Sequence, residues 1–94
     1  MNNILIVDSG STKTDWSFLP LEESRHIIRI KSPGVNPVLM SQNDIQNIFH
    51  SVRHQLGNIK NLEIYYFGAG CNPTLKHSID KIIKVIWETD KINL

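Results

Sequence analysis

The sequence predicts an α/β fold in which helices cover a mixed β-sheet. Four short segments are rich in β-branched and aromatic residues or alternate between apolar and polar side chains, which is typical of strands. Two longer segments repeat apolar residues with the helical period. The segments follow one another as strand, strand, strand, helix, strand and helix, and this order fits a mixed sheet with helical cover.

The first three predicted strands are separated only by short turns. Residues 4–7 form a continuous run of Ile, Leu and Val, which predicts a strand buried on both faces. Residues 15–19 and 26–31 alternate, and the second of these segments turns Ile28 and Ile30 inward. Three strands in such close succession predict an antiparallel meander.

A loop and a helix follow the third strand. Two prolines and a glycine exclude regular structure from residues 32–37. The helix is predicted from about Asn43 to Leu56, with Ser41 as its N-cap and Gly57 ending it in the left-handed conformation. Its apolar stripe consists of Ile45, Ile48, Phe49, Val52 and Leu56.

The last part of the chain repeats this alternation of strand and helix. A strand is predicted at residues 62–67, and the helix between the third and fourth strands makes a crossover, so the fourth strand should run parallel to its neighbour. Asn72 can cap a helix that begins at Pro73 and runs to about Glu88. Residues 92–94 begin the pattern of a further strand.

Length, charge and cysteine content limit the function classes. The 94 residues allow one domain, and a formal net charge of +1 lacks the basic field expected of a protein held to nucleic acid by phosphate contacts. One cysteine cannot form an internal disulfide. No apolar run approaches the roughly 20 residues of a membrane span, and the N-terminus lacks a signal-peptide pattern. We therefore expect a cytoplasmic protein with no nucleic-acid or membrane partner.

The turn after the first strand carries the strongest chemical signal. The strand delivers Asp8 at its end, and the following residues supply a glycine, several hydroxyls and Lys13. Closely spaced N–H groups around Gly10, with hydroxyl and ammonium donors, can bind phosphate oxygens, and a carboxylate can hold Mg²⁺ through waters. A plain polar hairpin is the alternative. A serine nucleophile is disfavoured because no histidine lies nearby in the sequence.

Residues 4–16 also resemble a known motif, in which an apolar strand is followed by the pattern D-x-G-x-T-x-T. This is the first phosphate loop of the actin, hexokinase and heat-shock ATPase superfamily. The segment is most similar to the BadF/BadG/BcrA/BcrD-type ATPases, which include N-acetylglucosamine kinase-like proteins. The later order of elements agrees, with a Gly-Val-Asn-Pro loop at residues 34–37 and a strand that ends at residues 68–71. Only the first loop is a specific motif.

The resemblance implies the fold and the roles of particular residues. The fold would be ribonuclease-H-like, with residues 1–94 forming part of the N-terminal nucleotide-binding lobe. Asp8 would organise Mg²⁺, and Asn36 would contact the substrate. The phosphate-binding residues would be Gly10, Ser11, Thr12, Lys13 and Thr14, with Thr14 supporting the turn. The cleft floor near the acceptor would be Gly68, Ala69 and Gly70.

The implied activity is the transfer of the ATP γ-phosphoryl group to a sugar hydroxyl. The family's catalytic Asp, second phosphate loop and adenosine-binding glycines have no match in these residues, so we expect the chain alone to be inactive. The alternatives are an activator ATPase for a partner redox enzyme and a non-catalytic binding module with the same fold. An exposed sheet edge would permit self-association.

Other candidate sites have simpler explanations. His50 and His54 share one helix face opposite the apolar stripe, but no third metal ligand accompanies them. Cys71 has no evident catalytic partner. The glycines of residues 68–70 lack the third glycine of a dinucleotide-binding loop.

Overall fold

The computed structural model describes residues 2–22, 25–68 and 72–94. Within them the elements are, in chain order, β1 (Asn3–Ser9), β2 (Lys13–Leu19), β3 (Ile28–Pro33), α1 (Gln42–Leu56), β4 (Leu62–Gly68), α2 (Pro73–Trp87) and β5 (Ile92–Asn93). This order confirms the predicted α/β class, although β3 begins and ends two residues later than the segment 26–31. The strands form one mixed sheet in the order β3-β2-β1-β4-β5.

Strand β1 lies at the centre of the sheet, and its two neighbours run in opposite directions. It pairs antiparallel with β2, which in turn pairs antiparallel with β3, so the predicted meander is confirmed. It pairs parallel with β4, as the crossover through α1 predicted. Strand β5 extends the parallel half of the sheet beyond β4.

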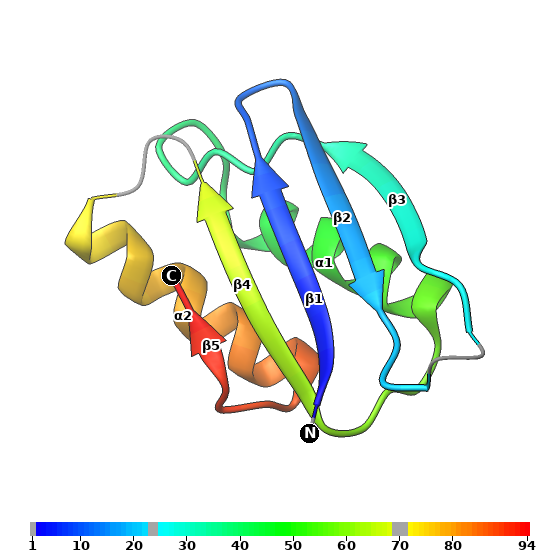
Figure 1. Ribbon diagram of the computed structural model, residues 1–94. Coiled ribbons are helices and arrows are strands. Elements are labelled where there is room, and N and C mark those ends of the chain that lie inside the picture. The colour runs from blue at the N-terminus through cyan, green and yellow to red at the C-terminus, as the bar shows by residue number, and fades with distance from the viewer. Residues whose placement is uncertain (1, 23–24, 69–71) are drawn as a thin grey trace.

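Both helices lie on the same face of the sheet, and no helix or strand of the described residues covers the other face (Figure 1). Leu5 and Val7 of β1 point to the helices and are 0% and 1% exposed. Ile4 and Ile6 point to the open face and are only half-buried. The prediction that β1 is buried on both faces is therefore wrong, because the helical cover reaches only every second residue.

The core between the sheet and the helices is built around aromatic rings. Trp16 of β2 meets Phe49 of α1 edge-on at 5.4 Å between ring centroids and lies 6.0 Å from Trp87 of α2. Phe49 also contacts Tyr66 of β4 at 6.5 Å. Aromatic side chains bury large apolar areas, so these contacts hold both helices against the sheet.

Both helices begin at the predicted caps. The Ser41 side chain accepts a hydrogen bond from the backbone N–H of Asp44 at 3.2 Å. The Asn72 side chain accepts one from the N–H of Leu75 at 2.9 Å, and Pro73 occupies the first helical position. Each cap satisfies a backbone donor that the first turn leaves without a helical acceptor.

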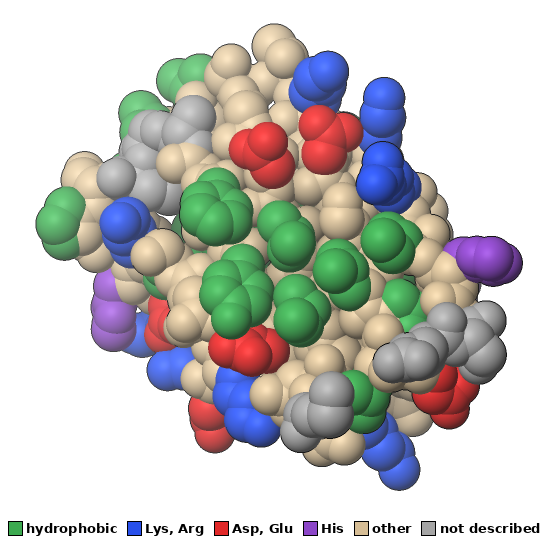
Figure 2. Space-filling model, in the orientation of Figure 1, with side chains coloured by type: hydrophobic (Ala, Val, Ile, Leu, Met, Phe, Trp, Pro, Cys, Tyr) green, Lys and Arg blue, Asp and Glu red, His purple; other side chains and the backbone are tan. Residues whose placement is uncertain are grey.

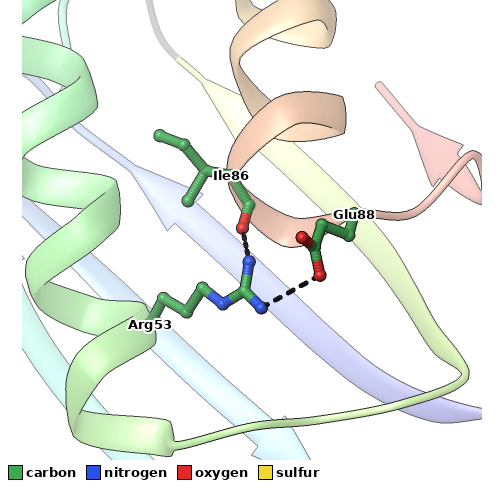
Figure 3. Close-up of polar contacts among 3 residues, drawn as sticks. All are labelled: Arg53, Ile86 and Glu88. Atoms are coloured by element: carbon green, nitrogen blue, oxygen red, sulfur yellow. Dashed lines mark hydrogen bonds and ion pairs between the residues drawn. The ribbon is translucent and has the colours of Figure 1, made fainter.

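The C-terminal ends of the helices differ from the prediction. Gly57 has a positive φ of 81°, but its ψ of −162° lies outside the left-handed helical region. The left-handed cap occurs instead at Glu88, which ends α2. Arg53 of α1 reaches across to this end, where it donates to the carbonyl oxygen of Ile86 and lies 3.3 Å from the Glu88 carboxylate (Figure 3). This contact joins the two helices.

Neither α1 nor α2 combines the length and the apolar character that a membrane crossing requires, and the described residues contain no other helix.

Candidate functional site

The candidate site lies at the edge of the sheet where β1 and β4 end. These strands are parallel and in register, with Asp8 beside Phe67 and Ser9 beside Gly68. The turn after β1 and the loop after β3 meet at this same edge (Figure 1). In open α/β sheets, ligands bind outside the carboxyl ends of parallel strands, so the topology itself favours this edge.

The turn between β1 and β2 is short and closed. The backbone N–H of Gly10 donates to the carbonyl oxygen of Lys13 at 2.8 Å. Ser11, Thr12 and Lys13 are exposed. In the part of the chain that the structure describes, no backbone hydrogen bond engages the N–H of Ser11 or Thr12. Two adjacent N–H groups that no backbone acceptor engages, in exposed residues of a tight turn, can bind an anion.

Two buried hydroxyls fasten this turn to the loop after β3. The Ser9 hydroxyl oxygen accepts from the N–H of Val35 at 3.0 Å and lies 3.1 Å from the carbonyl oxygen of Val35. Thr14, which is fully buried, donates to the carbonyl oxygen of Pro33 at 3.0 Å. The two hydroxyl oxygens lie 3.1 Å apart. We name these contacts of Ser9 and Thr14 with Pro33 and Val35 the hydroxyl clasp.

Gly34 lies inside the hydroxyl clasp, where the two loops touch backbone to backbone. A Cβ atom at Gly34 would lie 2.5 Å from the carbonyl oxygen of Gly10 and 2.6 Å from the carbonyl carbon and oxygen of Ser11. No side chain fits at such distances. The first residue of the Gly-Val-Asn-Pro segment is therefore required by packing against the turn.

Two carboxylates stand opposite each other where the turn leaves the sheet. Asp8 pairs with Asp15 across β1 and β2, and Asp15 pairs in turn with Lys31 of β3. Figure 2 shows acidic and basic side chains gathered at this end of the open face. Carboxylate oxygens suit Mg²⁺, which usually keeps several waters when few protein ligands are present. Within residues 2–22, 25–68 and 72–94, no three His, Cys, Asp or Glu side chains gather into a metal-binding group.

Asn36 lies in the loop directly after the hydroxyl clasp and is half-buried. Its side-chain oxygen accepts from the N–H of Val38 at 3.0 Å, so the oxygen belongs to a local turn. The Nδ2 amide is the part of this side chain left for a ligand. Val38 and Leu39, which come next, are 63% and 80% exposed.

The predicted cleft floor is described only in part. Gly68 ends β4 and is exposed, whereas Ala69 and Gly70 lie outside the described residues, as does Cys71. A cavity of about 330 Å³ lies beside Gly68. Its described lining is largely apolar, with one cation: Tyr66, Phe67, Gly68, Lys76, Ile79 and Leu94.

His50 and His54 are both exposed on α1, as predicted. They lie on the helix face that points away from the core and share an open surface depression with Arg53. Nothing in the described residues joins them to the turn after β1.

Sequence reasoning missed Ser9, Asp15 and Val35. The sequence does contain a signal for Asp15 and Ser9. A hairpin that turns at residues 10–13 pairs Asp15 with Asp8, and it places Ser9 on the same face of the sheet as Val7. The partner of Ser9 could not be found in this way, because Val35 lies 26 residues further along the chain.

No protein-family model matches the chain, and no curated protein matches its sequence.

Proposed function

We propose that the chain is the phosphate-binding part of an ATP- and Mg²⁺-dependent sugar kinase, most similar to N-acetylglucosamine kinase-like proteins. The structure of the turn after β1 supports the proposal most strongly. This closed turn contains the N–H groups of Ser11 and Thr12, and the loop after β3 packs against it. A plain hairpin would not need a fully buried hydroxyl and a close-packed glycine behind its turn.

The topology supports the same proposal. The strand order β3-β2-β1-β4-β5, with only β2 antiparallel to the rest, is the order expected for a ribonuclease-H-like sheet. In such a sheet the phosphates would bind at the turn between β1 and β2. The acceptor would bind near the C-terminal end of β4 and the loop at Asn36.

The residues at the turn fit a magnesium–nucleotide complex. Asp8 and Asp15 offer carboxylate oxygens at the strand end, where the positive charge of Mg²⁺ would also relieve their mutual repulsion. Lys13 and the Ser11 hydroxyl are exposed and can donate to phosphate oxygens. Thr14 is committed to Pro33, so its role is to support the turn. Mg²⁺ would neutralise the charge of the transferred phosphoryl group.

Phosphoryl transfer depends mainly on positioning and charge stabilisation. It also needs a carboxylate to accept the proton of the acceptor hydroxyl, a role that the resemblance assigns to none of the residues 1–94. The partners are a nucleotide and a sugar, and a second copy of the chain at the exposed edge of β3 is a further candidate. Because ATP is the phosphoryl donor, we place the activity in the cytoplasm. An activator ATPase is less favoured, since such proteins hold a cluster with several cysteines and this sequence has one.

A titration of the ¹⁵N-labelled chain with magnesium ATP tests the proposal. Binding to residues 1–94 should be weak because they match only the first phosphate loop of the resemblance, and the largest amide shifts should occur at Ser11 and Thr12. Asp8→Asn should remove the dependence of these shifts on Mg²⁺, whereas Asp44→Asn, at an exposed helix position, should leave it unchanged. Saturable shifts centred away from the turn, or none at millimolar nucleotide, would contradict the proposal.

A further inference from the structure

We propose that Ser9 is a positioning residue that couples the phosphate turn to the Asn36 loop, so that anion binding at residues 10–13 also orders the ligand-binding side of Asn36. This inference rests on the proposed function, which supplies the ligands of the two loops. It assigns to Ser9 a role that the D-x-G-x-T-x-T pattern leaves open, because Ser9 occupies a variable position of that pattern.

Ser9 forms hydrogen bonds with both backbone polar groups of Val35. Its oxygen accepts the N–H of Val35, and its proton is directed at the carbonyl oxygen of the same residue. A single side chain thus substitutes for a strand partner of Val35. Ser9 is 4% exposed and Val35 is 0% exposed, so these bonds do not compete with bulk water.

The neighbouring hydroxyl of Thr14 holds the same loop at a second point. Thr14 donates to Pro33, and its oxygen also lies within hydrogen-bond distance of Ser9. The loop is therefore held on both sides of Gly34, at Pro33 and at Val35. The same network continues to the core, because Trp16 donates from its indole nitrogen to the Ser32 hydroxyl at 2.8 Å.

The two loops pack against each other with no space between their backbones. The position of a Cβ on Gly34 falls 2.5 Å from the Gly10 oxygen, so the two backbones are already in contact. A turn that becomes more ordered on binding an anion must therefore restrict residues 34–36 as well. A second ligand at Asn36 would then lose less conformational entropy on binding, which is positive coupling without a large structural change.

Ser17 provides a matched comparison. It belongs to β2, opposite Ile6 of β1, and faces the open side of the sheet. It is half-buried, and no hydrogen bond of its hydroxyl occurs among the residues that the structure describes. A serine on the same hairpin can thus be present without connecting the two loops.

Hydrogen exchange of the ligand-free chain tests the coupling directly. In Ser9→Ala, the amides of Val35 and Gly10 should both exchange about tenfold faster than in the wild type, as expected when a buried hydrogen bond is lost. The Gly10 amide donates to Lys13 and is not bonded to the Ser9 side chain, so, once the intrinsic effect of the substitution on the next amide is subtracted, a role of Ser9 confined to the loop after β3 would accelerate Val35 alone. That result would overturn the inference. Ser17→Ala should change neither amide.

A second variant and a reference amide guard against a loss of the whole fold. Gly34→Ala keeps the Ser9 hydroxyl but forces the loops apart, and it should accelerate the same two amides. The Ile64 amide, which donates to Lys91 at the far end of the sheet, should keep its wild-type rate. Equal acceleration of Ile64 in both variants would mean general destabilisation and would overturn the assigned role.

Magnesium pyrophosphate then separates the inference from the proposed function. In the wild type it should shift the Ser11 and Thr12 amides and slow the exchange of Val35. In Ser9→Ala it should still shift Ser11 and Thr12 but no longer slow Val35. An absence of shifts at the turn would contradict the proposed phosphate site, whereas shifts at the turn without slower exchange at Val35 would contradict only the coupling.

Discussion

The two faces of the sheet belong to the same strands but differ in how deeply their side chains are buried. The face under the helices is closed and carries fully buried side chains, among them Leu5, Trp16 and Ile64. The open face carries a group of apolar side chains (Figure 2). Some of them are half-buried and others are exposed, and Phe67 is 59% exposed. The register assigns each residue to its face, because successive side chains of a strand point to opposite sides.

The same division runs through the candidate site. Asp8 points to the open face and is exposed, and its neighbour Ser9 points to the helices and is buried. Likewise Asp15 is on the open side and Thr14 on the covered side. The charged groups that could meet a ligand thus lie on the open side of the sheet, and the hydroxyls that hold the turn are buried on the covered side. The end of β1 supplies a charged group and a buried hydroxyl because successive residues of a strand point to opposite faces of the sheet.

Replacing a core aromatic should have the largest effect and should separate the faces most clearly. Phe49→Ala removes a fully buried ring that contacts Trp16 and Tyr66, and it should cost about 3–5 kcal/mol of the free energy of unfolding. Phe67→Ala is the matched change on the open face and should cost less than about 1 kcal/mol. Urea unfolding followed by circular dichroism measures both values, and equal losses would mean that the open face is packed as tightly as the covered one.

The contact between the helices should contribute less than the core. Arg53→Ala removes a donor to the Ile86 carbonyl oxygen at the end of α2, and it should cost about 1–2 kcal/mol. Glu88→Gln removes only the charge of a carboxylate whose side chain is 74% exposed, so it should cost no more than about 0.5 kcal/mol. Urea unfolding measures the free energy of unfolding of both variants. An equal loss in the two would mean that the ion pair, and not the hydrogen bond to Ile86, provides the stabilisation.

The carboxylates of the open face should oppose folding slightly. Asp8→Asn removes one of two like charges that face each other, and it should raise the free energy of unfolding by about 0.2–1 kcal/mol. Asp15→Asn should raise it less, because Asp15 also faces Lys31. Both gains should shrink at high salt. A loss of stability in Asp8→Asn would show instead that Asp8 makes a favourable contact in the ligand-free protein.

The smallest expected effect concerns the edge strand β5. The pKa of the Glu63 carboxyl is lowered below its ordinary value of 4.5. The largest cause is a hydrogen bond from the Asn93 amide, and a hydrogen bond from the Tyr65 hydroxyl is the next largest. The stability that Glu63 contributes is therefore present above pH 4.5 and is lost as the pH falls through its lower pKa in the folded state. A carboxyl-carbon NMR titration should show this, and Asn93→Ala should move the pKa back toward the ordinary value. An unchanged Glu63 pKa in Asn93→Ala would remove the amide as the cause.

Local signals in the sequence predicted most elements of the fold. Ser41 and Asn72 marked the starts of the helices because an N-cap needs only its own first turn. The burial of β1 was predicted incorrectly, since an apolar run does not say how many faces the rest of the chain covers. Arg53 and Ile86 could not be paired from the sequence either, because they lie 33 residues apart and meet only when the helices pack.

The candidate site was predictable to a similar degree. The composition of residues 10–13 predicts a phosphate turn, and the resemblance adds Asn36 from the Gly-Val-Asn-Pro segment, but nothing in the sequence marks Gly34 as a contact of the turn. The physical reason for Gly34, a backbone contact with Gly10, appears only in three dimensions. The partners of Ser9 likewise depend on where the third strand's loop returns.

The proposed phosphate site at the turn after β1 is tested most directly by adding Mn²⁺ with ATP to the ¹⁵N-labelled chain, since a paramagnetic ion broadens the amides near it. We predict that the strongest ATP-dependent broadening falls on Asp8, Ser11 and Thr12. Broadening centred on His50 and His54, with the turn unaffected, would contradict the account.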